Sequence, residues 1–175
     1  NGSVLALNAG LVGSTNTGRA FVSALAMTTQ GLLVGGDFES VGGSARTNLA
    51  AIDPTLGTPL DWTCHVSGPV TSLLPIGTNL FVAGRFAGIG DQVRSNLAAI
   101  SLPAGTVTSW DPGANGNVNS LITDGSGKLF CAGSFTSLGG QVRGRLAAFD
   151  GQTGALLPWD PFASGEIDSL AYRSN

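Results

Sequence analysis

The sequence repeats at a fixed interval, and this period constrains the fold more than any other feature. Steps of 48 and 49 residues separate the members of two series: Leu49, Leu97 and Leu146, and Trp62, Trp110 and Trp159. A period of roughly 20 to 50 residues is typical of stacked or closed repeat proteins. The chain is therefore expected to be a single domain built from similar units.

Three full units fit this period, with partial units on either side. Each begins with a run such as Val70–Leu73, in which apolar residues alternate with small or polar ones as in a β-strand. The expected boundaries within 1–175 are a partial unit at 1–21, full units at 22–69, 70–117 and 118–166, and the first strand of another unit at 167–175.

Each full unit is expected to contain four antiparallel strands. The first two are joined by a tight turn, and the Asp-Gly-Ser-Gly sequence at 124–127 has residues that tolerate positive φ. A glycine-rich loop leads to a third strand that starts Leu-Ala-Ala, and the fourth strand ends at the tryptophan. The second strands are placed at 32–38, 80–86 and 129–135.

Four strands in about 48 residues is the size of a β-propeller blade. A solenoid is the competing architecture, but leucine-rich repeats use only about 20 to 29 residues and β-helix coils are shorter still. Helices are not expected, because Glu, Lys and Gln are scarce and 27 glycines punctuate the short apolar runs. The predicted fold class is an all-β propeller.

Residues 1–21 fit the second half of a unit, with Gly10 in the place of the glycine that precedes each fourth strand. An alternative phase makes Val4–Leu7 a second strand. No tryptophan stands near Ser14, where the repeat has one, so this first unit is expected to be degenerate.

Charge and composition exclude several classes of function. Eight Lys and Arg stand against eleven Asp and Glu, for a net charge of −3, so no basic surface for nucleic acid or an anionic membrane is expected. The apolar runs are too short for a membrane span. Because His65 is the sole histidine, no metal, cofactor or catalytic triad is expected.

The motifs of the unit resemble those of the delta-sixty (domain-of-unknown-function) β-propeller repeats of bacterial secreted and surface proteins. The similar motifs in the first full unit are Gly-Gly-x-Phe at 35–38, Gly-Gly at 42–43, Arg46, Leu-Ala-Ala-x-Asp at 49–53 and Trp62. The stretch from this Asp to Trp62 is also similar to the tryptophan-docking pattern of quinoprotein-like propellers.

The resemblance implies a propeller, an extracellular or cell-surface location, and tryptophans that pack between neighbouring blades. It implies no common activity. Two departures from the pattern stand out: Ser101 replaces the Asp, and Thr63 with Cys64 replaces the Asp-Pro that follows the other two tryptophans.

Residues that recur in every unit are interpreted as structural, because a catalytic group is normally unique in a ring. The tryptophans are expected to be largely buried at equivalent positions. The recurring arginines are expected to bind a neighbouring carboxylate or a loop carbonyl: Arg46, Arg94 and Arg143. Four aspartates are expected to cap turns through their side chains: Asp53, Asp111, Asp150 and Asp160.

The two cysteines stand at different phases of the repeat. Cys131 takes the place that Val34 and Val82 hold in the other units, which predicts a small core residue. Cys64 follows Trp62. A disulfide between the two cysteines is therefore not expected.

Polar positions that differ between units are the candidates for a binding surface: Asp37, Arg85 and Asp91. The favoured function is a non-catalytic structural or interaction module, with a protein or glycan partner. The alternative is a fragment or subunit of a propeller enzyme, quinoprotein-like or carbohydrate-active. Because rings have about four to eight blades, the chain is expected to join a larger propeller by self-association or within a longer chain; closure as four blades is the alternative.

Overall fold

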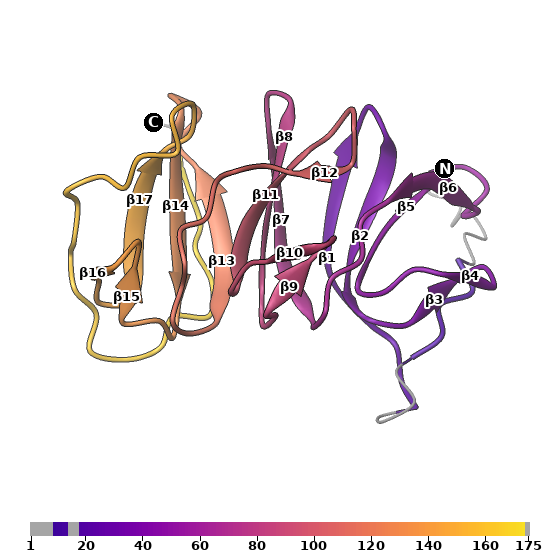
Figure 1. The fold of residues 1–175 in the computed structure, drawn as a ribbon, viewed down its shortest axis with the longest axis horizontal. Coiled ribbons are helices and arrows are strands. Elements are labelled where there is room, and N and C mark those ends of the chain that lie inside the picture. Colours follow the sequence, from indigo (N-terminus) through magenta and orange to yellow (C-terminus); the bar gives the residue numbers. More distant parts are fainter. Residues whose placement is uncertain (1–8, 14–17, 174–175) are drawn as a thin grey trace.

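The computed structural model describes residues 9–13 and 18–173. Every regular element in these residues is a β-strand, so the predicted all-β class is confirmed. None of them belongs to a helix that could cross a membrane. Three antiparallel sheets stand side by side along the long axis (Figure 1), and each is formed by one repeat unit.

Unit 1 contains β1 (Phe21–Thr28), β2 (Gly31–Asp37), β3 (Ser40–Val41), β4 (Ser44–Ala45), β5 (Leu49–Ile52) and β6 (Pro59–Thr63). Unit 2 contains β7 (Val70–Ile76), β8 (Asn79–Gly84), β9 (Gly88–Ile89), β10 (Gln92–Val93), β11 (Leu97–Ser101) and β12 (Thr106–Val107). Unit 3 contains β13 (Val118–Thr123), β14 (Lys128–Gly133), β15 (Ser137–Leu138), β16 (Gln141–Val142) and β17 (Leu146–Asp150).

The strands of each unit form a simple antiparallel meander. The sheet orders are β1-β2-β5-β6, β7-β8-β11-β12 and β13-β14-β17. The four predicted strands are thus present in units 1 and 2. In unit 3 the fourth strand is reduced to a bridge between Phe149 and Leu156. Pro158, which follows shortly after, has no N–H to donate to a longer ladder.

The glycine-rich loops contain an element that the sequence analysis missed. Each loop folds into a short hairpin, β3–β4, β9–β10 or β15–β16. The hairpin binds the segment that leads into its unit: the Gly42 N–H donates to the Ala9 carbonyl (2.9 Å), and the Gly90 N–H donates to the His65 carbonyl (2.7 Å).

This pairing corrects the expected phase of the N-terminal region. Ala9 takes the place of His65, in the connecting segment that precedes a unit, and Val12 forms a bridge with Ser40. Residues 9–12 are therefore not the turn before a fourth strand, as Gly10 had indicated. Val4–Leu7, the alternative second strand, lies outside the described residues.

Residues 167–172 lie along β13 but do not form the predicted strand. The Ile167 N–H donates to the Gly133 carbonyl (3.1 Å), and the Leu170 N–H donates to Oγ of Ser120 (3.1 Å). Every other first strand pairs with a second strand of its own unit. Residues 167–172 have no such strand beside them in the described part of the chain, so no ladder forms.

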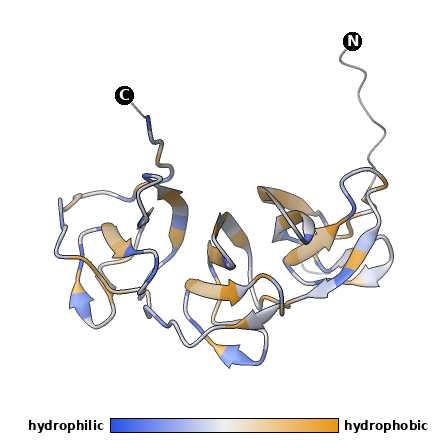
Figure 2. Cartoon of the chain, turned by 90° about the horizontal axis from the view of Figure 1, so that it is seen from above, coloured by the Kyte–Doolittle hydropathy of each residue, from blue (hydrophilic) through white to orange (hydrophobic). Residues whose placement is uncertain are grey.

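The hydrophobic core lies between the sheets. Leu33 and Leu49 of unit 1 pack with Val70 and Leu73 of unit 2, and the same arrangement recurs between units 2 and 3. Four alanines of the third strands, Ala51, Ala98, Ala99 and Ala147, are buried there, where small side chains let adjacent sheets approach. Seen from above, the three sheets follow an arc, with hydrophobic strand residues between neighbours (Figure 2).

Candidate functional site

The recurring tryptophans join each unit to the next. The Trp62 indole N–H donates to the Leu102 carbonyl of unit 2 (2.9 Å), and the Trp110 indole N–H donates to the Gly154 carbonyl of unit 3 (2.8 Å). Both rings are half-buried. They lie between neighbouring units as predicted, although they are less buried than expected.

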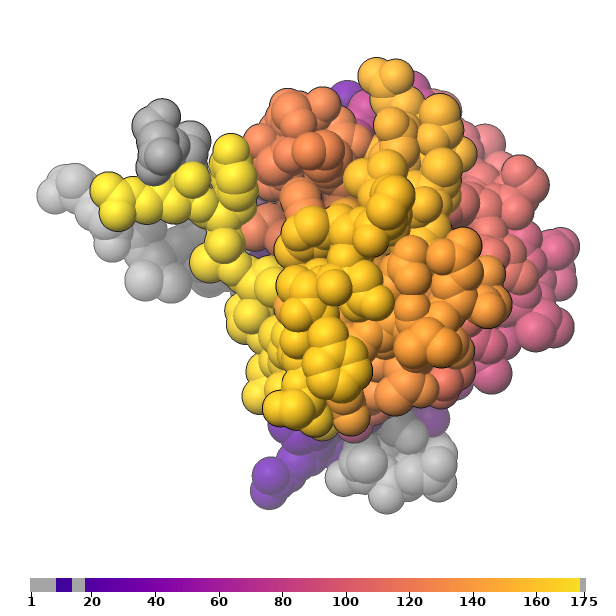
Figure 3. Space-filling view, turned by 90° about the vertical axis from the view of Figure 1, so that its left-hand side faces the viewer, coloured from indigo at the N-terminus to yellow at the C-terminus, as the bar shows by residue number. Residues whose placement is uncertain are grey.

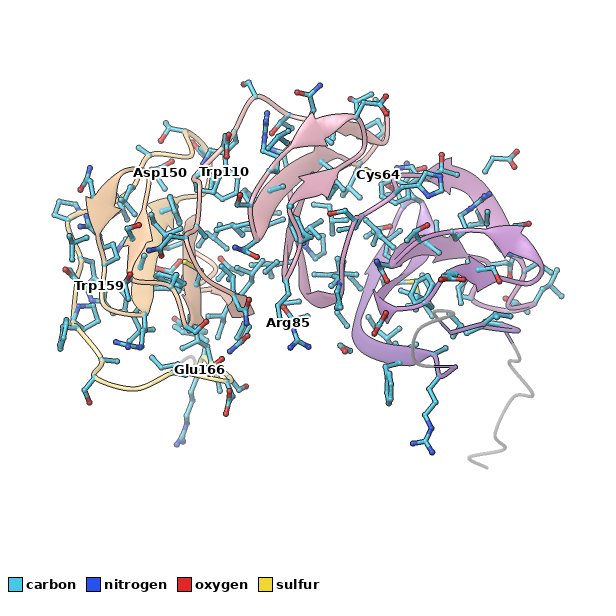
Figure 4. The ribbon with its side chains drawn as sticks, turned by 60° about the horizontal axis from the view of Figure 1, so that its bottom comes forward. Cys64, Arg85, Trp110, Asp150, Trp159 and Glu166 are labelled. Carbon is cyan, nitrogen blue, oxygen red and sulfur yellow. The ribbon has the colours of Figure 1, made fainter. Side chains whose placement is uncertain are left out.

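Trp159 differs from these two tryptophans. It is 43% exposed, so the prediction of a buried ring is wrong here. Its ring meets Phe130 of its own unit edge to face, with centroids 5.2 Å apart. Trp110 makes two such contacts, one with Phe81 and one with Phe149 of the next unit. Trp159 lacks the second contact and lies on the outer side of unit 3 (Figure 4).

The recurring arginines fix the fourth strand region of their own unit. Their Nη2 atoms donate to the carbonyls of Leu60, Thr108 and Leu157, at 3.2, 3.0 and 3.1 Å for Arg46, Arg94 and Arg143 respectively. This is the predicted bond to a carbonyl. In the described chain a carboxylate partner is found for Arg94 alone, where Nη1 lies 3.7 Å from Oδ2 of Asp111.

A third recurring contact was not predicted. Asn48 and Asn96 have positive φ of 64°, and each side-chain amide donates to the segment leading into the next unit, at the Val66 carbonyl (2.9 Å) and the Ala114 carbonyl (3.0 Å). Arg145 takes this place in unit 3, with φ of 67°. The signal was present in the sequence, because Asn48 and Asn96 each precede the Leu-Ala-Ala motif.

Two of the four aspartates cap turns as predicted. Oδ1 of Asp53 accepts the Leu56 and Thr55 N–H groups, and Oδ1 of Asp150 accepts those of Thr153 and Gln152. These hydrogen bonds lower the pKa of both carboxyls.

The prediction is wrong for Asp111 and Asp160. Asp111 faces Arg94, and Oδ1 of Asp160 accepts the Gly144 N–H at 3.4 Å. Both aspartates directly follow a tryptophan, in the segment that leads out of the unit, whereas Asp53 and Asp150 stand at the turn that follows the third strand.

A cavity of about 390 Å³ lies where units 1 and 2 meet. It is bounded by the segment after β6, the turn of the β9–β10 hairpin and the start of β12. We call it the junction pocket, and its lining residues are Thr63, Cys64, His65, Gly90, Asp91, Gln92, Gly105, Thr106 and Val107.

The junction pocket contains the histidine and one of the cysteines. The backbone N–H of Thr47 donates to Nδ1 of His65 (3.5 Å), so the neutral ring carries its proton on Nε2. The pKa of the Cys64 thiol is raised to about 11, mainly by burial; the Gly90 N–H lowers it and the Asp91 carboxylate raises it. Cys64 is therefore a neutral thiol near pH 7.

The three sequence candidates are not brought together. Asp91 lies in the junction pocket, at the hairpin turn. Arg85, just after β8, is exposed and points away on the opposite side of unit 2 from Cys64 (Figure 4). Asp37 ends β2 at the position equivalent to Arg85 and is half-buried. Sequence reasoning missed Cys64 and His65 as pocket residues.

Both cysteines are free, and they lie in different hydrophobic clusters. Cys131 is fully buried, which confirms its predicted core role. In residues 9–13 and 18–173, no three His, Cys, Asp or Glu side chains are grouped so as to hold a metal ion.

No protein-family model and no curated protein matches this sequence. Solved structures with a similar fold include two computationally designed proteins. Ika4 matches with a TM-score of 0.59 and 14% identity, over 100% of this chain and 89% of its own. Ika8 matches with a TM-score of 0.54 and 14% identity, over 88% of this chain and 41% of its own. At this identity the likeness concerns the fold alone.

Proposed function

We propose that this chain is a non-catalytic interaction module, a segment of a β-propeller from a secreted or cell-surface bacterial protein, that binds a small hydroxyl-rich ligand in the junction pocket. One observation carries the proposal: the pocket collects polar residues that do not recur. At the next junction the residues equivalent to Cys64, His65 and Asp91 are Pro112, Gly113 and Gly140.

The propeller part of the proposal is supported by the arrangement of the units. Each unit is an antiparallel meander whose first strand, β1, β7 or β13, lies beside that of its neighbour. The core lies between consecutive sheets, which follow an arc (Figure 2). Radial repetition of such sheets is how propellers are built. The extracellular setting is proposed from the sequence resemblance.

The polar groups of the pocket indicate the class of ligand. Asp91 offers a carboxylate acceptor, Nε2 of His65 a donor, and Thr106 and Gln92 groups of both kinds. The lining has no Lys or Arg, and Asp91 is negative, so an anionic ligand is disfavoured. A bound cation needs more oxygen ligands than a single carboxylate provides. Sugar hydroxyls, which both donate and accept, match this set.

The same groups favour binding over catalysis. The Cys64 thiol is held protonated by burial, so it is a poor nucleophile near pH 7. Nδ1 of His65 is engaged by the Thr47 N–H and is not free to act as a base toward Cys64. Trp62, Trp110 and the recurring Arg and Asn side chains are bound to backbone carbonyls.

An NMR titration with a panel of neutral mono- and disaccharides tests this proposal. We expect the amide signals of Gly90, Asp91 and Gln92 to shift on binding. Asp91→Asn should weaken binding about tenfold or more, because the charged acceptor of the pocket is lost. Asp37→Asn, on another side of the sheet, is the control and should have no effect.

Two results would contradict the proposal. If no saccharide shifts the pocket amides, the ligand class is wrong. If Asp91→Asn and Asp37→Asn bind a saccharide equally well, the ligand is held elsewhere.

A further inference from the structure

Each junction between units is formed by two different faces. The forward face of a unit carries residues of its second and third strands and its tryptophan, as with Phe81, Leu97 and Trp110 in unit 2. The rear face of the following unit presents its first strand, as with Val118 and Leu121 in unit 3. The junction of units 1 and 2 is built in the same way.

The rear face of unit 1 is uncovered along its first strand, although Val34, Ala50 and Ile52 of its second and third strands are buried. Val22 is 44% exposed and Leu25 is 60% exposed. The equivalent residues at the rear of units 2 and 3 are buried: Val70 and Val118 are 0% exposed, and Leu73 and Leu121 are 9% and 8% exposed. Burying Val22 and Leu25 in the same way would gain hydrophobic free energy.

The forward face of unit 3 is only partly covered. Phe130 and Leu146 are only half-buried, whereas their equivalents Phe81 and Leu97 are buried. With Trp159 and Ile122 they line a cavity of about 180 Å³, closed on one side by residues 170–172. Figure 3 looks onto this end, where the yellow C-terminal segment crosses unit 3.

We propose that the forward face of unit 3 binds the rear face of unit 1 of a second copy of this chain. The occupant is a second copy because one chain carries both halves of an interface that it already forms twice within itself. Such a head-to-tail contact is heterologous, so it produces a closed ring or an open row of copies according to the rotation at each step.

The polar contacts of the internal junctions can be repeated in the new one. Oγ1 of Thr71 donates to the Val118 carbonyl (2.7 Å), and Oγ of Ser72 accepts the Leu121 N–H (3.1 Å). On unit 3 the equivalent side chains are Asn119 and Ser120. Their partners in the second copy are the Val22 carbonyl and the Leu25 N–H.

In the single chain, the C-terminal segment occupies the position on unit 3 that β1 of the second copy takes in the proposed contact. Asn119 donates to the Ile167 carbonyl (3.1 Å), and Ser120 accepts the Leu170 N–H (3.1 Å), so residues 167–170 imitate the first strand of a following unit. Strand β1 pairs with β2 from Phe21 to Thr28, whereas 167–172 pair with no second strand in the described chain. A second copy therefore displaces the segment, because its β1 is already paired within a complete four-stranded sheet.

Light scattering over a concentration series tests the association. The expected mass is at least twice 17.5 kDa. Leu25→Asp alters the rear face and Trp159→Asp the forward face, and each should weaken association about tenfold or more. A mixture of the two variants should form a one-to-one dimer, because each variant retains the half that the other lacks. Val142→Asp, at an exposed apolar position on the β15–β16 hairpin outside both faces, is the control.

A fourth variant tests the displacement. Leu170→Asp loosens the C-terminal segment without altering the residues of either face, and it should strengthen association. A monomer at every concentration overturns the proposal and leaves a longer chain as the source of the next unit. It is also overturned if Leu25→Asp still associates like the unaltered chain, which indicates a symmetric contact, or if Leu170→Asp does not strengthen association. Circular dichroism checks that each variant is folded.

Discussion

Trp110 and Trp159 occupy the same position of the repeat, but they lie in two different environments. Trp110 is bound to the unit that follows, whereas the ring of Trp159 packs on Phe130 of its own unit. Trp110→Ala is expected to cost about 3–5 kcal/mol of unfolding free energy, the range for a large aromatic in a core. Trp159→Ala should cost less than half of that.

Urea unfolding in dilute solution, where the chain is least associated, measures both values. Equal losses for the two variants would show that the contact with the next unit contributes nothing.

Cys64 provides a second test, through pH. The thiol of an unfolded chain ionises at about pH 8.5, whereas burial raises the pKa of the folded Cys64 thiol to about 11. Folding therefore favours the protonated form. Its contribution to stability is complete below the unfolded pKa and is lost as the pH rises toward the folded one.

We accordingly expect Cys64→Ala to lose less stability than the unaltered chain between these two pKa values. Urea unfolding at stepped pH measures the difference, and Cys131 is common to both proteins. Parallel pH profiles would mean that Cys64 is not buried as described.

Among the elements, two turns of unit 3 contain a matched pair of glycines: Gly154 precedes the fourth-strand region, and Gly140 lies in the turn of the β15–β16 hairpin. Gly154 and Gly140 both have φ of 73°, but a Cβ at Gly154 would lie 2.5 Å from Cδ1 of Trp110, and one at Gly140 would meet nothing within 4 Å. Alanine at Gly140 should cost about 1–2 kcal/mol for the left-handed backbone alone. Alanine at Gly154 should cost more, because it also displaces the tryptophan of the preceding unit.

Thermal unfolding of Gly140→Ala and Gly154→Ala separates the two contributions. Similar losses for both variants would contradict the close packing of Trp110 on the turn at Gly154.

The strands could be predicted from the sequence, because alternation and turn glycines are local signals. The hairpins could not, since β9 and β10 have two residues each and are held by the connecting segment rather than by their own pattern. The prediction of a strand at residues 167–172 was wrong for a related reason. Their alternation matched a strand, but a strand also requires a partner, and none stands beside them in the described chain.

At the scale of the whole molecule, the sequence identified Asp91 as a candidate binding residue but did not identify the junction pocket in which it lies. Positions that vary between units are visible in the sequence, yet which of them meet depends on the side of the sheet that each loop occupies. Asp37 and Arg85 share a phase at the end of the second strand, away from the hairpin turn that holds Asp91. Cys64 and His65 reach Asp91 from the preceding unit, 26 residues earlier in the case of His65.

These polar contacts share one property: a side chain of one unit binds a backbone group of the next unit or of the segment that leads into it. Trp62 binds the Leu102 carbonyl, Asn48 binds the Val66 carbonyl, and Ser72 accepts the Leu121 N–H. Backbone groups are present whatever the side chain. Substitutions of side chains in the unit that supplies the backbone groups therefore leave these hydrogen bonds between neighbouring units intact. A unit can in this way acquire polar pocket residues such as Asp91 or His65. It then has a new binding specificity, while its contacts with the neighbouring units are preserved.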